Sequence, residues 1–516
     1  MPIKHPNLHL QRMSGAIPAW SGSIAGTDLP LICQAVRDGG GRLVALWGSD
    51  ERKQDKGFAL HVLLVNETGL VCLSVVLPVE QPSYPDLSPI FPAASRMQRA
   101  VYDLLGIAAN AARDQRKWLR HAAWSSDSFP LRKDFDAAQS CTDESDNYPF
   151  VQVEGLGVHE IPVGPVHAGI IEPGHFRFSI VGEKVLRLEE RLGYTHKGIE
   201  KRFESMSLQQ GAKLAGRVSG DSTVAYAWAY AMAAESSANA TPPDRALWLR
   251  ALLLERERVA NHLGDLGYLG NDVALAFGFA QFWILKEQVL RNNAALFGHR
   301  YLMDSIIPGG VAVDISFEGK QVIEQECAML EQQVHILRSI YEEHAGVQDR
   351  FIGAGRVDPK LAAQLGLCGL AGRASSQAWD TRVQFPCAPY DKLDVQMATY
   401  RNGDVAARVI VRFDELFESL RLQRKILVNL IGGDELARPM EKLPANGVGI
   451  GMVEGWRGEV MVAIHTDAEG NLARVHPHDP SWQNWPVLEH AIMGNIVPDF
   501  PLINKSFNLS YSGHDL

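Results

Sequence analysis

The chain has 516 residues, of which 46% are hydrophobic and 21% are charged, a composition typical of folded globular proteins and not of disordered ones. At about 150 residues per domain, this length predicts roughly two to four domains. The formal net charge of −10 argues against a nucleic-acid-binding protein, because binding to phosphate groups requires a basic surface.

The cysteines and the amino terminus exclude further classes. The 6 cysteines are scattered, and no two of them stand in a C-x-x-C spacing. The sequence therefore predicts neither a disulfide scaffold nor a cysteine-bound cluster. The first residues lack the apolar core of a signal peptide, and no run of about 18 apolar residues occurs. We expect a soluble, cytoplasmic, multi-domain protein.

The first block, residues 1–135, is predicted to be a small α/β domain. Three short stretches rich in aliphatic residues and bounded by Gly, Asp, Asn or Pro predict strands, and they are 43–48, 59–66 and 71–78. A helix is expected over 95–105. Residues 136–148 are acidic and almost free of large apolar side chains, which predicts a linker.

The second block, residues 149–516, is predicted to be mostly helical with β flanks. Short strands are expected around 182–190 and over 458–467. Apolar periodicity predicts long helices at 244–266, 277–297, 319–345 and 413–430. Arg258 lies among apolar neighbours on the first of these helices, and a buried arginine there requires a carboxylate partner.

Three motifs that could bind a ligand are better explained by structural roles. GVGIGMVEG (447–455) lacks the spacing of a dinucleotide fingerprint and is interpreted as a flexible turn. His196 and Glu200 are four residues apart and would share a helix face suitable for a metal, but an ion pair or a helix cap is the favoured interpretation. Glu257 and His262 are five apart, which does not align them.

Three polar groups are candidates for chemistry. Glu172 follows two isoleucines, and apolar surroundings would raise its pKa and suit it to proton transfer; an exposed turn residue is the alternative. RVSGDS (217–222) precedes a helix, where Ser and Asp usually serve as caps. Arg457 lies in GWRGE, where glycines allow a partner to approach the backbone closely.

Taken together, several long segments resemble one family in their order and spacing. The family is the large subunit of energy-converting nickel–iron hydrogenases of the formate hydrogenlyase type, and its relative is the 49-kDa subunit of respiratory complex I. The segments are PVGPVHAGIIEPGHFRF (162–178), GYTHKGIEK (193–201), LERERVANHLGDLG (254–267), FGHRYLMDSIIPGGV (297–311) and GNIVPDFPLINKSFNLSYSG (494–513). The first block resembles the 30-kDa subunit of complex I, through YPDLSPIFPAASRMQRAVYDLLGI (84–107) and FPLRKDF (129–135).

The resemblance implies an α+β fold: a 30-kDa-like α/β domain over 1–135, an acidic linker over 136–148, and a mostly helical hydrogenase-like domain over 149–516. It also shows a departure. The family binds nickel and iron through two C-x-x-C pairs, because soft thiolates suit that centre. The corresponding positions here are Ser219, Ser222, Ser510 and Gly513. Since serine is a poor soft-metal ligand and glycine offers none, we expect this chain to bind no metal and not to turn over hydrogen.

Other residues of the family cleft are retained. Glu172 matches the glutamate that passes protons at the metal site, Arg217 matches the arginine before the first cysteine pair, and Arg457 matches the arginine that overhangs the centre. With Asp221, they are the candidate catalytic residues. An emptied metal site with such groups resembles complex I, where a quinone head group occupies that space. The tyrosine that complex I presents to the quinone corresponds to Gly220.

The resemblance therefore implies a subunit of a membrane-associated oxidoreductase complex. Electrons would pass from a 4Fe–4S cluster in a small partner subunit to a quinone-like acceptor, coupled to ion translocation by antiporter-like membrane subunits. This chain would bind no cofactor except a quinone, and would lie peripherally on the cytoplasmic side of the cell membrane. The alternative is a structural or coupling subunit, without a substrate, that links the redox module to the membrane arm.

Overall fold

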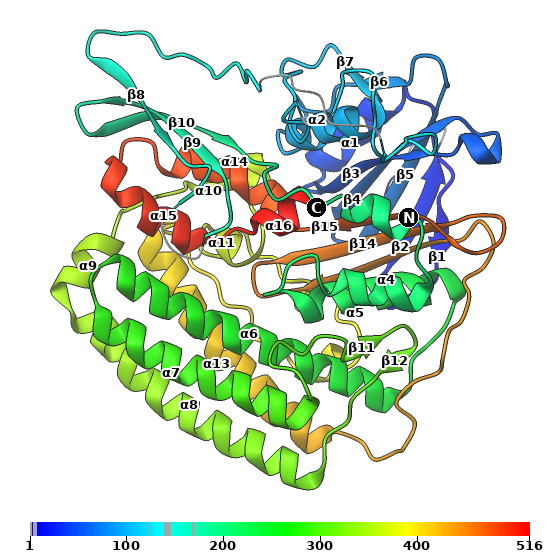
Figure 1. Cartoon of the computed structure of the whole chain (residues 1–516). Helices are drawn as coiled ribbons and strands as arrows, with labels where there is room; N and C mark the ends of the chain where they lie inside the picture. The colour runs from blue at the N-terminus through cyan, green and yellow to red at the C-terminus, as the bar shows by residue number, and fades with distance from the viewer. Residues whose placement is uncertain (1–2, 4–7, 123, 139–145, 168–170) are drawn as a thin grey trace.

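The structure is a computed structural model that describes residue 3 and residues 8–122, 124–138, 146–167 and 171–516. The amino-terminal region is a five-stranded sheet with the strand order β1-β2-β5-β4-β3. Its strands are β1 (Gln11–Met13), β2 (Ala19–Ser23), β3 (Arg42–Asp50), β4 (Phe58–Asn66) and β5 (Gly69–Leu77). Helices α1 (Leu29–Asp38) and α2 (Ala94–Leu105) cover one face, and β6 (Ser83–Pro85) pairs with β7 (Ala108–Asn110) (Figure 1).

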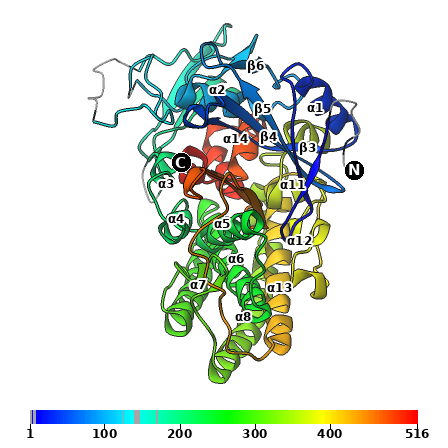
Figure 2. The same cartoon turned by 90° about the vertical axis from the view of Figure 1, so that its right-hand side faces the viewer.

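Four long helices pack together in the second region, at the end of the molecule opposite the amino-terminal sheet (Figure 2). They are α6 (Asp244–Asp272), α7 (Ala276–Phe297), α8 (Phe317–Glu343) and α13 (Val405–Asn429). The second region also contains shorter helices, which are α3 (Ile199–Phe203), α4 (Leu208–Ala215), α9 (Ala345–Phe351), α10 (Pro359–Leu365), α11 (Gly369–Arg373), α12 (Thr381–Gln384), α14 (Ser481–Ala491), α15 (Phe500–Phe507) and α16 (Tyr511–Asp515).

Two antiparallel three-stranded sheets flank the helices. The first contains β8 (Val158–Val163), β9 (His175–Val181) and β10 (Lys184–Arg191), and the second contains β13 (Val448–Glu454), β14 (Glu459–Thr466) and β15 (Leu472–His478). A two-stranded pair joins β11 (Ile306–Ile307) and β12 (Gly310–Val311). The α+β fold expected from the sequence, with a small α/β region followed by a mostly helical one, is confirmed.

The expected long elements are present, with one early helix start. Helix α13 begins at Val405 and not at residue 413, because the Asp404 carboxylate caps it by accepting the backbone N–H of Ala407 at 2.8 Å. Its first turns carry the buried arginines Arg408 and Arg412, which interrupt the apolar pattern in the sequence. The proposed linker lies partly outside the described residues, at 139–145, and the domain boundaries stay a prediction.

The glycine-rich run at 447–455 is not a flexible turn, so that interpretation is wrong. Most of it forms β13, and helix α5 (Thr223–Ala238) packs directly on this strand. A side chain at Gly449 or Gly451 would clash with a backbone carbonyl of α5. The glycines are therefore required by the close approach of helix and strand.

The amino-terminal sheet and the β13–β15 sheet meet face to face. Side chains alternate along β3, so that Gly48 faces α2 while Trp47 points to the other side, against His476 of β15. Arg474 also donates a hydrogen bond from Nε to the carbonyl oxygen of Gly48 at 2.9 Å. Among the described residues, no helix is long and apolar enough to cross a membrane.

Candidate functional site

The four positions expected to replace metal-binding cysteines come from two distant segments of the chain and are joined by direct contacts. Ser219 follows α4, Ser222 precedes α5, and Ser510 caps α16 by accepting the backbone N–H of Gly513. The hydroxyl oxygens of Ser219 and Ser510 are 3.0 Å apart. Both side chains are buried. The fold thus brings the two sequence motifs into contact.

Arg457 and Asp221 form the centre of this site. The Arg457 Nη1 donates to Asp221 Oδ1 at 2.8 Å, and Nη2 contacts the other carboxylate oxygen. The same carboxylate accepts a hydrogen bond from Ser219 at 2.8 Å. Burial acts to raise the pKa of Asp221, but the Arg457 charge and these hydrogen bonds outweigh it and lower the pKa to about 2. Asp221 is therefore an anion at neutral pH and a poor proton donor.

Asp479, which sequence reasoning missed, fills the space beside Gly513. A Cβ atom at Gly513 would lie 2.5 Å from Asp479 Oδ2. This carboxylate is buried and is held by the Tyr226 hydroxyl at 2.8 Å and the Ser481 backbone N–H at 2.9 Å. Hydroxyls and carboxylates provide no soft thiolate, and Gly513 has no room for a side chain. The residues present therefore do not fit a thiolate-bound nickel–iron centre.

Two candidate residues lie outside this cluster. Arg217 is exposed and forms a bidentate ion pair with Asp304, with N–O distances of 2.7 and 2.8 Å, and no contact of the described residues joins it to Arg457 or Asp221. Glu172 is exposed, and its carboxylate accepts the backbone N–H of Ser512 at 3.1 Å. Glu172 thus contacts the carboxy-terminal helix α16, whereas Arg217 points to the surface.

Glu257, which the sequence analysis considered only as a partner of His262, is a second carboxyl group near this cluster. It is buried, and its carboxylate accepts the backbone N–H groups of Val224 and Ala225 at 2.6 and 3.2 Å, at the start of α5. Burial raises its pKa to about 8. A small cavity between Glu257, Asp221 and Lys286 has room for about one water molecule. The signal in the sequence was a glutamate on the same apolar helix as Arg258, within the segment LERERVANH.

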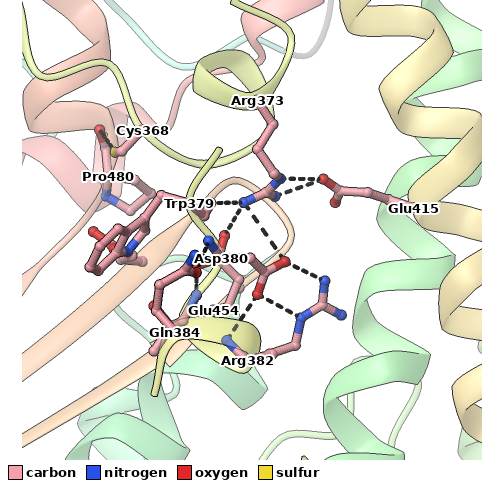
Figure 3. A network of polar contacts seen from close by, with 12 residues as sticks. Cys368, Arg373, Trp379, Asp380, Arg382, Gln384, Glu415, Glu454 and Pro480 are labelled. Atoms are coloured by element: carbon pink, nitrogen blue, oxygen red, sulfur yellow. Dashed lines mark hydrogen bonds and ion pairs between the residues drawn. The ribbon is translucent and has the colours of Figure 1, made fainter. Parts of the chain in front are cut away.

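A network of buried arginines and carboxylates connects α11, α13 and β13 (Figure 3). Arg373 of α11 donates to Glu415 of α13 at 2.8 Å and to Glu454 of β13 at 2.7 Å. The partner predicted for Arg258 is confirmed, because its Nη2 donates to Glu415 at 2.6 Å. Burial raises the pKa of Glu454 to about 7. In contrast, the charges of Arg373 and Arg258 hold the pKa of Glu415 well below its ordinary value.

The paired His196 and Glu200 do not form a joint site. The Glu200 carboxylate is 2.6 Å from Arg474 Nη2 and 2.7 Å from His476 Nδ1, whereas His196 contacts the backbone oxygen of Asp515 at 2.8 Å. The ion-pair interpretation of Glu200 is confirmed.

Two family models match the chain. Residues 23–140 match the 30-kDa subunit of respiratory-chain NADH dehydrogenase, and residues 272–446 match its 49-kDa subunit. The chain belongs to the family of fused 30-kDa/49-kDa-type subunits that complex I shares with hydrogenase complexes.

Individual relatives agree with this assignment. Formate hydrogenlyase subunit 5 of Escherichia coli (strain K12) is 31% identical over 92% of this chain and 85% of its own length. The fused C/D subunit of the NADH-quinone oxidoreductase of Bacteroides thetaiotaomicron is 27% identical over 77% of this chain and 78% of its own length. A chain of the membrane-bound sulfane sulfur reductase, an archaeal respiratory membrane complex, superposes with a TM-score of 0.66 at 25% identity, covering 70% of this chain and 99% of that chain.

Proposed function

We propose that this chain is a large subunit of the redox module of a membrane-bound, multi-subunit respiratory complex, and that it works without a nickel–iron centre. Its membership in the 30-kDa/49-kDa family supports the first part. The single observation that carries the second part is that Ser219, Ser510 and Gly513 stand at the family's metal positions, with the Asp479 carboxylate filling the space beside Gly513.

We also propose its partners and location. An iron–sulfur small subunit supplies a 4Fe–4S cluster, since the described cysteines of this chain are separate and mostly buried. Antiporter-like membrane subunits hold the chain peripherally on the cytoplasmic side of the cell membrane, a location supported by its similarity to a chain of an archaeal respiratory membrane complex. Affinity purification of the tagged chain from solubilised membranes tests this assembly. Co-purification of both partner types is expected, with less than stoichiometric nickel and no hydrogen evolution; isolation of the chain alone would contradict it.

Within this complex, electrons pass from the partner cluster to a quinone-like acceptor, coupled to ion translocation. The acceptor would bind beside Asp221 and Arg457. A quinone head group requires the Asp221–Arg457 pair to open, because the neighbouring cavity holds only about one water molecule.

The second candidate is a coupling role, in which the chain binds no substrate and transmits conformational change to the membrane arm. A specific observation favours it: the buried Asp479 carboxylate lies beside Gly513 and accepts a hydrogen bond from the buried Tyr226 hydroxyl, while the buried Trp456 indole donates to the backbone oxygen of Asp221. These buried contacts beside Gly513 support the coupling role.

Photolabelling of the intact complex with a reactive quinone analogue separates the two roles. Labelling of peptides near Ser219–Ser222 or Arg457, reduced by competing native quinone, identifies an acceptor site. Under the coupling role, this chain is not labelled while the complex still transfers electrons. Asp221→Asn adds a second readout: it lowers quinone reduction if the site binds the acceptor, but lowers only ion movement per electron if the chain couples. Asp304→Asn, which alters an exposed pair, is the control.

A further inference from the structure

A group of potential metal ligands lies at the interface of the two facing sheets, apart from the cluster around Arg457. Trp47, His61 and Ser74 are paired across β3, β4 and β5, so their side chains project from the same face. On the opposing sheet, His465 of β14 points toward them. The rings of His61 and His465 have their centres 4.5 Å apart. Two histidines from distant parts of the sequence therefore meet at this interface.

A carboxylate completes the group. Glu51 follows β3, and its Oε1 lies 3.8 Å from His61 Nε2. One ligand atom from each of Glu51, His61 and His465 lies within 4.8 Å of the other two. The Ser49 hydroxyl is 2.9 Å from both Glu51 Oε1 and His61 Nε2. Three donors with a neighbouring hydroxyl match the number of ligands in a four-coordinate site.

The histidines are in a state suited to bind a metal. The Nε2 atom of His465 is buried and has no hydrogen-bond partner among the described residues, which is costly for a polar atom in the interior. Burial also lowers the pKa of His465 to about 4 and that of His61 well below its ordinary value. Both rings are thus neutral at pH 7 and offer a lone pair. The Ser74 hydroxyl lies 2.9 Å from His61 Nδ1 and orients the His61 ring.

The charges around the group are compatible with a cation. Glu51 brings a negative charge, and the nearest positive charge facing the histidines, Arg474, is paired with Glu200 at 2.6 Å. Glu51 and His465 are only partly buried, so an ion reaches the group from solvent.

We propose that Glu51, His61 and His465 bind a divalent transition-metal ion, with Zn²⁺ as the best match to two imidazoles and one carboxylate, and that this ion clamps the amino-terminal sheet to the β13–β15 sheet. The fourth position belongs to the Ser49 hydroxyl or a water molecule. To bind zinc, the ligand atoms must move about 1 Å closer together, so that each lies roughly 2.0–2.2 Å from the ion. The proposal concerns a structural clamp and is independent of the role of the Arg457 cluster.

The test uses the full-length chain without a histidine tag, stripped with a chelator and dialysed against Zn²⁺. We expect one bound zinc per chain, a higher melting temperature with zinc, and an X-ray absorption spectrum with only N and O ligands at about 2.0–2.2 Å and no sulfur near 2.3 Å. Glu51→Gln and His465→Gln should each weaken zinc affinity at least tenfold. His159→Ala, which removes an exposed histidine, should leave zinc binding unchanged.

A gain of signal guards against variants that simply misfold. His465→Cys should retain one zinc and add a single sulfur ligand to the absorption spectrum, a result that a misfolded chain does not produce. The proposal is overturned if zinc binds at much less than one equivalent, if the parent chain shows sulfur ligation, or if Glu51→Gln and His465→Gln bind zinc as tightly as the parent.

Discussion

Glu257 is a buried carboxyl group at the start of α5, and its environment favours the protonated form. Because burial raises its pKa in the folded chain from 4.5 to about 8, the folded state holds this proton more tightly than the unfolded state. Its contribution to stability is therefore complete below pH 4.5 and is lost as the pH rises to about 8. A group with this behaviour is suited to holding a proton near the Arg457 cluster.

Replacing Glu257 by Gln removes this titration. We expect the free energy of unfolding of Glu257→Gln, relative to the parent, to increase by on the order of 4 kcal/mol between pH 4.5 and 8 and to level off above that range. Urea unfolding at a series of pH values measures it. Glu80→Gln, at an exposed position, is the control. A pH-independent difference for Glu257→Gln would contradict the assignment.

Gly513 occupies a position where the structure leaves no space for a side chain. In Gly513→Ala, the new methyl group would lie 2.5 Å from Asp479 Oδ2 and 2.9 Å from the Ser510 hydroxyl oxygen. We expect a loss of about 1–3 kcal/mol in unfolding free energy, as for other overpacked sites. Gly220→Ala is the matched control, since its Cβ meets no atom within 4 Å and should change stability by less than about 0.5 kcal/mol. Equal unfolding midpoints for the two variants would show that Asp479 moves away easily.

At the level of elements, buried ion pairs join helices that the apolar pattern alone does not fix relative to one another. Arg258 of α6 and Arg373 of α11 both donate to Glu415 of α13, and all three side chains are fully or almost fully buried. A buried charge that loses its partner is costly, so these contacts select one arrangement of the three helices.

Arg258→Ala tests this contribution. Removing the guanidinium leaves Glu415 with one fewer donor in the interior, and we expect a loss of about 3–5 kcal/mol in unfolding free energy. Arg438→Ala breaks the exposed pair with Glu435 and should cost at most about 1 kcal/mol. Urea unfolding of both variants gives the comparison. Similar small losses would mean that Arg373 alone satisfies Glu415.

For the whole molecule, the contact between the amino-terminal sheet and the β13–β15 sheet unites the two regions. Trp47 is buried in this contact, with its ring stacked against His61 at 5.3 Å and His476 at 5.0 Å. The Gln483 side chain of α14 also donates to the carbonyl oxygen of Val44 in β3. The two regions therefore share a hydrophobic core and are joined by direct packing as well as by the chain that connects them.

Trp47→Ala should remove part of this shared core. We expect a loss of about 3–5 kcal/mol, as for other buried tryptophans, together with faster amide hydrogen exchange in both β3–β4 and β14–β15. Hydrogen exchange followed by mass spectrometry measures the effect. Val76→Ala, at an exposed position of β5, serves as the control. Faster exchange confined to β3–β4 would indicate that the sheets are stabilised separately.

Much of the fold was predictable from the chain, because local periodicity carries it. The strands of the first block and the helices α6, α7 and α8 have clear patterns, and the buried partner of Arg258 followed from the cost of an isolated charge. The family resemblance also predicted that Ser219, Ser222, Ser510 and Gly513 replace four cysteines, because comparing motifs requires only the residue at each position.

Contacts between distant segments required the folded structure. Arg217 and Asp221 are four residues apart, yet Arg217 pairs with the exposed Asp304 and Asp221 pairs with the buried Arg457. Asp479 fills the space beside Gly513. The glycine-rich run at 447–455 forms a strand that packs closely against α5. These outcomes depend on which side chains tertiary packing brings together and removes from water. Residue types and spacing describe only one stretch of chain at a time, so they do not contain that information.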